Sequence, residues 1–194
     1  MIKAFQLIFS PAVTWEEIVS ANRGFFSIVF LYLLPLMLIS AGIEGYSLVR
    51  LGERRGQFDY VVSISQQLAL RYEITQVLLG FAIIWVGARF LQAVGTSFEL
   101  PSTYLQSFTT IAYGFSPIFL TRALDAIPAL NTWICWAIGA LIAISVLYHG
   151  IALVLKPDQT KGFGLYLLSI IFVLFLSGLA HFVAVSVLHE KLLK

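Results

Sequence analysis

Long apolar runs separated by short polar connections divide the chain. Crossing a bilayer as a helix takes ~20 mostly apolar residues. Five runs meet that length: 25–43, 74–95, 105–124, 133–155 and 163–188. They are continuously apolar rather than alternating, which favours helices over the strands of a membrane barrel. The pattern predicts an all-α integral membrane protein built as a bundle of five transmembrane helices, within a single domain covering 1–194.

Two connections have the amphipathic pattern of helices that lie on a membrane surface. In residues 1–24, Ser10 is a suitable N-cap and Pro11 suits the first helical position. Trp15 and Ile18 of that segment are expected to enter the interface. In the connection 44–73, one helical face would carry Phe58, Val61, Val62, Ser65, Leu68, Ala69 and Tyr72. We therefore expect short N-terminal and loop amphipathic helices, the latter over 58–72.

Composition agrees with the membrane assignment. Hydrophobic residues make up 59% of the chain and charged residues only 11%, against ~25% in ordinary soluble domains. This composition excludes a disordered chain. It also provides too few polar residues to cover the surface of a water-soluble globule, so we expect the protein to lie in the lipid bilayer. The net charge of +2 comes without a basic tract, so no nucleic-acid partner is expected. Cys135 is the only cysteine, so no intrachain disulfide or cysteine metal cluster can form.

The sequence contains no motif of a known intramembrane enzyme. No Ser-x-x-Lys, His-Glu-x-x-His or pair of intramembrane aspartates occurs. We expect no enzyme, no catalytic residue, no metal site and no cofactor. Glu44 follows the first span, where we expect it to reach water, and no acidic residue falls inside a span.

Ionisable residues inside spans are functional candidates because burying them in lipid is unfavourable. Arg89 lies about 9 Å from the end of its span and is expected to snorkel to the interface; a buried ion pair or ligand role is the alternative. His149 and His181 should lie at opposite depths and hydrogen-bond across helices rather than share a metal. Arg122 and Asp125, three residues apart, are expected to neutralise each other.

The central run carries a distinctive proline motif. Pro117 has no amide hydrogen to donate to the carbonyl of Tyr113, which should free that carbonyl and bend the span. Gly114 permits close helix approach. Two interpretations remain open: an ordinary kinked span, or a fixed hinge that lines a cavity.

Several short motifs, in this order and spacing, resemble the Yip family of five-span membrane proteins. They are Ser10-Pro11 with Thr14-Trp15 and Ile18, Ala112-Tyr113 with Pro117, Ile127-Pro128-Ala129-Leu130, and Tyr148-His149-Gly150. The chain looks like the compact bacterial type. Eukaryotic members are named for interaction with Ypt/Rab GTPases. Their Asp-Leu-Tyr-Gly-Pro motif and long cytosolic N-terminal region are absent here, so that role is not carried over.

The resemblance implies a multi-pass protein of the cell inner (plasma) membrane with a cytoplasmic N-terminus and the C-terminus on the far side. The distribution of lysine and arginine points the other way, because slightly more of them fall on the C-terminal side. Our expectation follows the family.

Two functions are in competition. The first is a non-enzymatic scaffold or adaptor, in membrane organisation or trafficking-like processes, that binds other membrane proteins or itself. Small residues four apart support it by allowing close helix contact: Ala41/Gly45, Gly139/Ala143 and Ala180/Ala184. The alternative is a channel or transporter for a small solute or ion around the kinked third span, with Arg89 or His149 in the path. A polar cavity at mid-membrane depth would favour transport.

Overall fold

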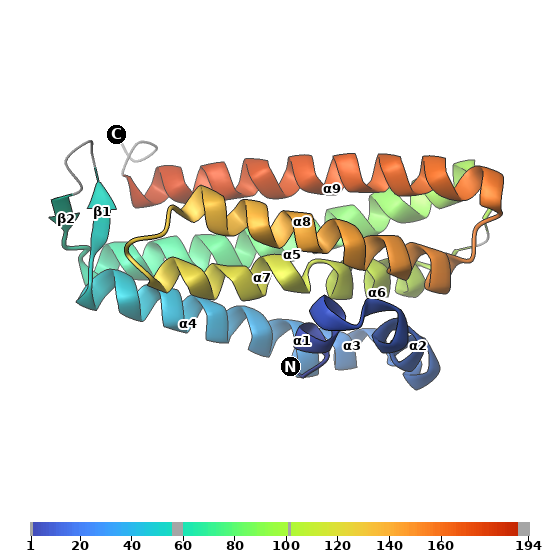
Figure 1. Ribbon diagram of the computed structural model, residues 1–194, viewed down its shortest axis with the longest axis horizontal. Coiled ribbons are helices and arrows are strands. Elements are labelled where there is room, and N and C mark those ends of the chain that lie inside the picture. Colours follow the sequence, from blue (N-terminus) through green and yellow to red (C-terminus); the bar gives the residue numbers. More distant parts are fainter. Residues whose placement is uncertain (1, 56–59, 101, 190–194) are drawn as a thin grey trace.

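The structure, a computed structural model, describes residues 2–55, 60–100 and 102–189, and nearly all of them are helical (Figure 1). The helices are α1 (Ile2–Phe9), α2 (Pro11–Ala21), α3 (Phe25–Ile28), α4 (Leu34–Arg50), α5 (Gln66–Ser97), α6 (Tyr104–Gly114), α7 (Ser116–Thr121), α8 (Thr132–Gly150) and α9 (Gln159–Leu188). Two π-helical turns, η1 (Val29–Leu33) and η3 (Ile151–Leu155), and a 3₁₀ turn, η2 (Arg122–Ala126), continue them. The predicted all-α class is confirmed.

Four of the described helical segments are long and apolar enough to cross a membrane: Phe25–Arg50, Gln66–Ser97, Thr132–Leu155 and Lys161–Leu188. They contain the first, second, fourth and fifth predicted spans. In the first, the π turn η1 precedes Pro35, which cannot donate to the carbonyl of Leu31. A wider turn accommodates that missing hydrogen bond, so α3, η1 and α4 run on as one helix.

The third predicted span is broken into two short helices. α6 ends at Gly114 and α7 begins at Ser116, so the helix is interrupted beside Pro117, where the sequence predicts a bend. The carbonyl of Tyr113 is not left bare, because the hydroxyl of Ser116 donates to it. α6 packs against α5 and α8, and α7 packs against α8 and α4, so both halves lie within the bundle (Figure 1).

The predicted surface helix over 58–72 is wrong. Residues Glu53–Arg55 (β1) and Tyr60–Val62 (β2) pair as a short antiparallel hairpin, with Glu53 opposite Val62. Ser65 then caps α5 by accepting the amide hydrogen of Leu68 at 3.2 Å, and that helix runs unbroken to Ser97. Ala69 and Tyr72, from the predicted apolar face, belong to the buried face of this long helix. Phe58 and Asp59 lie outside the described residues.

The N-terminal helices α1 and α2 each bury one face against the bundle and leave the other exposed. α2 begins at Pro11, as predicted, but Trp15 is fully buried and does not face the interface. Its indole Nε1 donates to the carbonyl of Val146 in α8 at 2.8 Å. Gly150 makes room for the ring, because a Cβ there would lie 2.7 Å from Trp15 Cε2. Because its N–H already donates a hydrogen bond inside the bundle, the indole of Trp15 does not require an acceptor at the membrane interface.

Aromatic rings fill the core at this end of the bundle. Tyr113 stacks on Tyr32 with ring centroids 4.1 Å apart and meets Trp15 edge-on at 6.1 Å. The rings of Tyr32, Tyr113 and Trp15 are all buried. Tyr113 and Pro117, singled out by the sequence, thus occupy the packed interior, and Gly114 lies against Leu147.

Candidate functional site

Three charged side chains meet inside the bundle, and we call them the buried charge cluster: Glu44 of α4, Glu73 of α5 and Arg122 of η2. Their exposed fractions are 1%, 8% and 5%. Arg122 Nη2 donates to Glu44 Oε2 at 2.7 Å and to Glu73 Oε2 at 3.0 Å. Charges removed from water are strongly unfavourable unless they are paired, and here one guanidinium serves two carboxylates.

Neutral groups of α5 complete the surroundings of Glu44. Tyr72 donates its hydroxyl to Glu44 Oε1 at 2.7 Å, and Gln76 Nε2 lies 3.4 Å from the same oxygen. Residues 72 and 76 are one turn apart, so they share the face of α5 that is turned towards α4. The expectation that Glu44 reaches water is wrong, because α4 continues about two turns past the predicted end of the first span.

Asp125 is near the cluster but does not pair with Arg122, so that predicted pair is wrong. Its Oδ2 accepts from the hydroxyl of Thr132 at 3.2 Å, while Glu44 and Glu73 take Arg122. Among the described residues, Glu73 Oε1, Arg122 Nε and Asp125 Oδ1 have no hydrogen-bond partner. The cluster therefore holds more carboxylate than its single guanidinium can neutralise.

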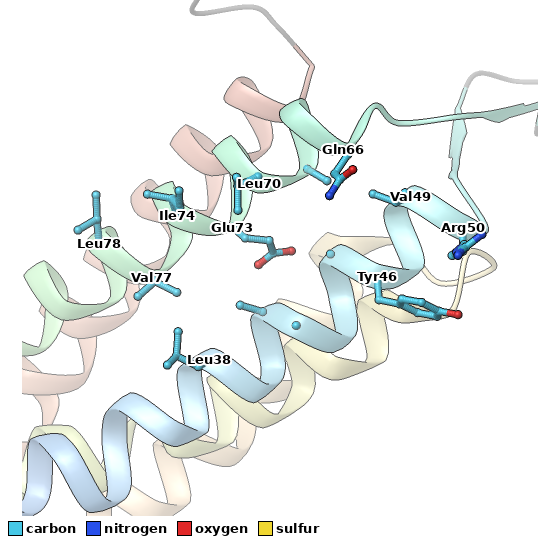
Figure 2. Close-up of a pocket in the computed structure, with 14 residues that line it drawn as sticks. Leu38, Tyr46, Val49, Arg50, Gln66, Leu70, Glu73, Ile74, Val77 and Leu78 are labelled. Carbon is cyan, nitrogen blue, oxygen red and sulfur yellow. The ribbon is translucent and has the colours of Figure 1, made fainter.

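A groove between α4 and α5 opens sideways beside the cluster (Figure 2). Its volume is about 780 Å³, and its floor is made of the small residues Ala41, Gly42, Gly45 and Ala69. Leu38, Leu70, Ile74, Val77 and Leu78 form apolar walls, with Arg50 and Gln66 at one end. Figure 2 shows the side chain of Glu73 extending from α5 into the space between the two helices. The groove is thus apolar except for one acidic group and its polar end.

A second cavity, of about 340 Å³, lies at the hairpin end of the bundle. Glu44, Tyr72, Asp125 and Thr132 line it, together with residues next to β1 and at the end of α9. Its lining is part polar and part apolar, and it lies towards one end of the helices rather than midway along them. Further along, the interior is filled by buried side chains such as Ile84, Ile111 and Tyr113.

The three ionisable candidates from the spans lie apart from one another. Arg89 is exposed, with its guanidinium 4.6 Å from the ring centroid of Tyr104 at the start of α6. His149 is exposed and donates to the carbonyl of Ser145 in its own helix at 2.9 Å, so its expected bond across helices is wrong. His181 is 6% exposed and lies 3.4 Å from the hydroxyl of Thr132, across the α8–α9 contact.

The small-residue pairs have different surroundings. Gly139 faces α7, where a Cβ would lie 2.8 Å from Ile118 Cα, and Ala143 is fully buried. Ala184 is buried against the base of α4 and α5. These two pairs serve internal packing, so the lateral contact expected at Gly139 and Ala143 is wrong. Of the three pairs, Ala41/Gly45 alone lines the groove.

Sequence reasoning missed the charge cluster although a signal was present. On α5 each of the buried positions Ala69, Tyr72, Glu73, Gln76 and Gly80 has another of the set three or four residues away. That spacing continues through Ile84 and Leu91 in the apolar span. The polar residues are therefore in phase with the inward face of the helix, which marks them as interior rather than as part of a loop.

Comparison with known proteins identifies one family for this chain. Among curated proteins and among solved structures, nothing matches the chain. The family model described as the Yip1 domain matches residues 5–182, which include α2 to α8 entirely and most of α1 and α9. The match agrees with the resemblance carried by the Tyr113–Pro117 and Tyr148-His149-Gly150 motifs. The chain belongs to the Yip1 domain family of membrane proteins.

Proposed function

We propose that this protein is a non-enzymatic scaffold or adaptor of the cell inner membrane, in membrane organisation or trafficking-like processes. It acts by binding other membrane proteins through lateral helix contacts. The observation that supports this is the groove between α4 and α5, which opens sideways over a floor of small residues. Lipid tails are as apolar as leucine, so helices associate in membranes through close packing and hydrogen bonds. The groove offers both.

Position-specific photo-crosslinking in the native membrane tests the proposal. Leu78 lines the groove and is 63% exposed, whereas Leu141 on α8 is 68% exposed elsewhere. A crosslinker at residue 78 should give a protein adduct of discrete mass, and one at residue 141 should not. Equal adducts at both positions, or none at residue 78, would contradict lateral binding at this groove.

A groove-filling variant provides the matched control. Gly42 lines the groove, and no atom lies within 4 Å of a Cβ placed there. Gly42→Leu should therefore fold normally and remove the residue-78 adduct. Ala82→Leu, at an exposed position of α5 outside the groove, should leave that adduct unchanged.

Transport of a small ion or solute is the second candidate function. The polar cavity that contains Glu44 and Asp125 favours it, because ionisable residues in spans often mark ion pathways. The buried rings of Tyr32 and Tyr113 further along the bundle count against a continuous path. The purified protein in liposomes should pass no common ion above the rate of empty vesicles. A reproducible flux that Arg89 or His149 variants abolish would favour the transporter instead.

A further inference from the structure

We propose that the partner held in the α4–α5 groove is a transmembrane helix of another protein that carries a lysine or arginine, and that this basic group pairs with Glu73. The inference rests on the proposed function, because it names the chemistry of the partner. Three features lead to this proposal: the floor of the groove, the unpaired Oε1 of Glu73 and the charge of the buried charge cluster.

The floor of the groove suits a helix. Ala41, Gly42 and Gly45 project nothing larger than a methyl group along one face of α4, which lets another backbone come close. The walls are apolar and open to the lipid, with Ile74 50% exposed and Leu78 63% exposed. A second helix in the groove would cover these wall side chains, which otherwise face lipid.

The unpaired oxygen points to a hydrogen-bond donor. Glu73 is 8% exposed, and its Oε1 has no partner among the described residues. Its other oxygen is taken by Arg122, and its stem lies against Gly45, 3.1 Å from a Cβ placed there. Glu44 lies deeper, outside the lining of the groove, and both of its oxygens accept hydrogen bonds. Glu73 is therefore the acidic group that a partner meets.

The charge of the cluster selects a basic donor. Glu44 and Glu73 share the single guanidinium of Arg122, so a second cation is needed before both carboxylates are neutralised in a region that excludes water. Ionisable groups inside membranes pair with one another, because the alternative is an uncompensated charge in lipid. A serine or threonine hydroxyl would satisfy Glu73 Oε1 but would not balance this charge. A lysine or arginine does both.

Two other occupants match the contact less well than a basic helix of another protein does. Gly45, beside Glu73, is five residues from the end of α4 at Arg50, or about 7.5 Å along the helix axis. A phospholipid with its phosphate at Arg50 would place ester carbonyls at that depth, and these only accept hydrogen bonds. A second copy could offer the exposed Arg89, but that guanidinium already lies over the ring of Tyr104.

Model transmembrane peptides test the charge directly. The full chain is reconstituted in phosphatidylcholine vesicles with a leucine–alanine helix that carries one lysine about five residues from its end, the depth set by the helical rise. The matched peptide has leucine in that position, and association is measured by energy transfer between fluorophores. The lysine peptide should bind more tightly, by on the order of tenfold, as expected for one interhelical polar contact.

Variants at Glu73 separate pairing from folding. Glu73→Gln should abolish the preference for lysine, and Glu73→Asp, which keeps the charge, should retain most of it. Gly42→Leu should weaken both peptides alike, because it fills the groove. Glu16→Gln, at an exposed position of α2, is the control and should change nothing.

Each contrary result has its own meaning. Equal binding of both peptides, or a lysine preference that survives Glu73→Gln, overturns the pairing and leaves lateral binding standing. A residue-78 adduct whose mass is that of a phospholipid or of a second copy also overturns it. Loss of every adduct at residue 78 removes the proposed function itself.

Discussion

Arg122 holds two carboxylates in place, and the fold depends on it more than on any exposed cation. Replacing it by methionine leaves Glu44 and Glu73 buried without their partner. Breaking a buried ion pair in this way costs about 3–5 kcal/mol. We therefore expect Arg122→Met to lower the thermal unfolding midpoint strongly in detergent, while Arg71→Gln on the exposed face of α5 leaves it nearly unchanged.

The same measurement has an internal check. Adding Glu44→Gln and Glu73→Gln to Arg122→Met removes the uncompensated charges, so part of the lost stability should return. If the triple variant is no more stable than the single one, packing rather than charge explains the effect of Arg122.

Gly139 and Gly42 form a second contrast between interior and surface. At Gly139 a side chain would meet the backbone of α7, whereas at Gly42 it would enter open space. We expect Gly139→Leu to reduce the yield of folded, monodisperse protein severely and Gly42→Leu to leave it intact. Equal yields in size-exclusion chromatography would contradict this packing of α7 on α8.

Glu99 is an ionisable group outside the spanning helices, and the cause of its pKa shift is clear. It lies after the end of α5 and bonds to Lys161, and that bond and the lysine charge lower the pKa of its carboxyl. A lowered pKa in the folded state means that the pair stabilises the fold at neutral pH and that this effect is lost as the pH falls. The parent should be slightly more stable than Glu99→Gln at pH 7, and the difference should disappear as the pH falls through the lowered pKa. A difference that persists in acid would assign the effect to something other than this ion pair.

At the scale of elements, the indole of Trp15 is the largest side chain that α2 buries in the bundle, beside Thr14 and Ile18. Trp15 donates to the carbonyl of Val146 and fills the space over Gly150. Trp15→Phe removes the hydrogen bond at a cost of about 1 kcal/mol, and Trp15→Ala also empties a core site, at a cost of about 3–5 kcal/mol. Protease cleavage near Arg23, between α2 and α3, should accelerate in that order. Trp15→Phe and Trp15→Ala cleaving at the rate of the parent would mean that other contacts hold α2.

The sequence predicted the elements whose signals are local. Long apolar runs located the four spanning helices, Pro11 located the start of α2, and Pro117 located the break after Gly114. Two of the errors came where a polar residue was assumed to end a helix. Glu44 and Glu73 are polar yet interior, because their partner Arg122 is distant in sequence and its proximity depends on how α4, α5 and η2 pack. A single sequence does not specify that packing.

At the scale of the whole molecule, the bundle has two distinct ends. α2 lies against η3 at one end, and the hairpin approaches the end of α9 at the other, where His189 Nε2 lies 3.1 Å from Glu53 Oε1. Following the family, we predict that the end with α2 and Lys156 is cytoplasmic. A reporter active only in the periplasm should then work when fused at the C-terminus. Activity from a cytoplasmic reporter there would show the inverse orientation.

The length of the two longest helices has a consequence for the membrane itself. α5 has 32 residues and α9 has 30, so they extend about 48 and 45 Å, against a hydrocarbon core of about 30 Å. The polar ends of both helices, such as Gln66 and Lys161, can extend beyond the core, but the apolar run 163–188 of α9 is itself about 39 Å long. A hydrophobic length above that of the core is relieved by tilting the bundle or by thickening the surrounding lipid, each at a small free-energy cost per ångström. Thick regions of bilayer reduce that cost, so we expect this protein to concentrate where the membrane is thicker.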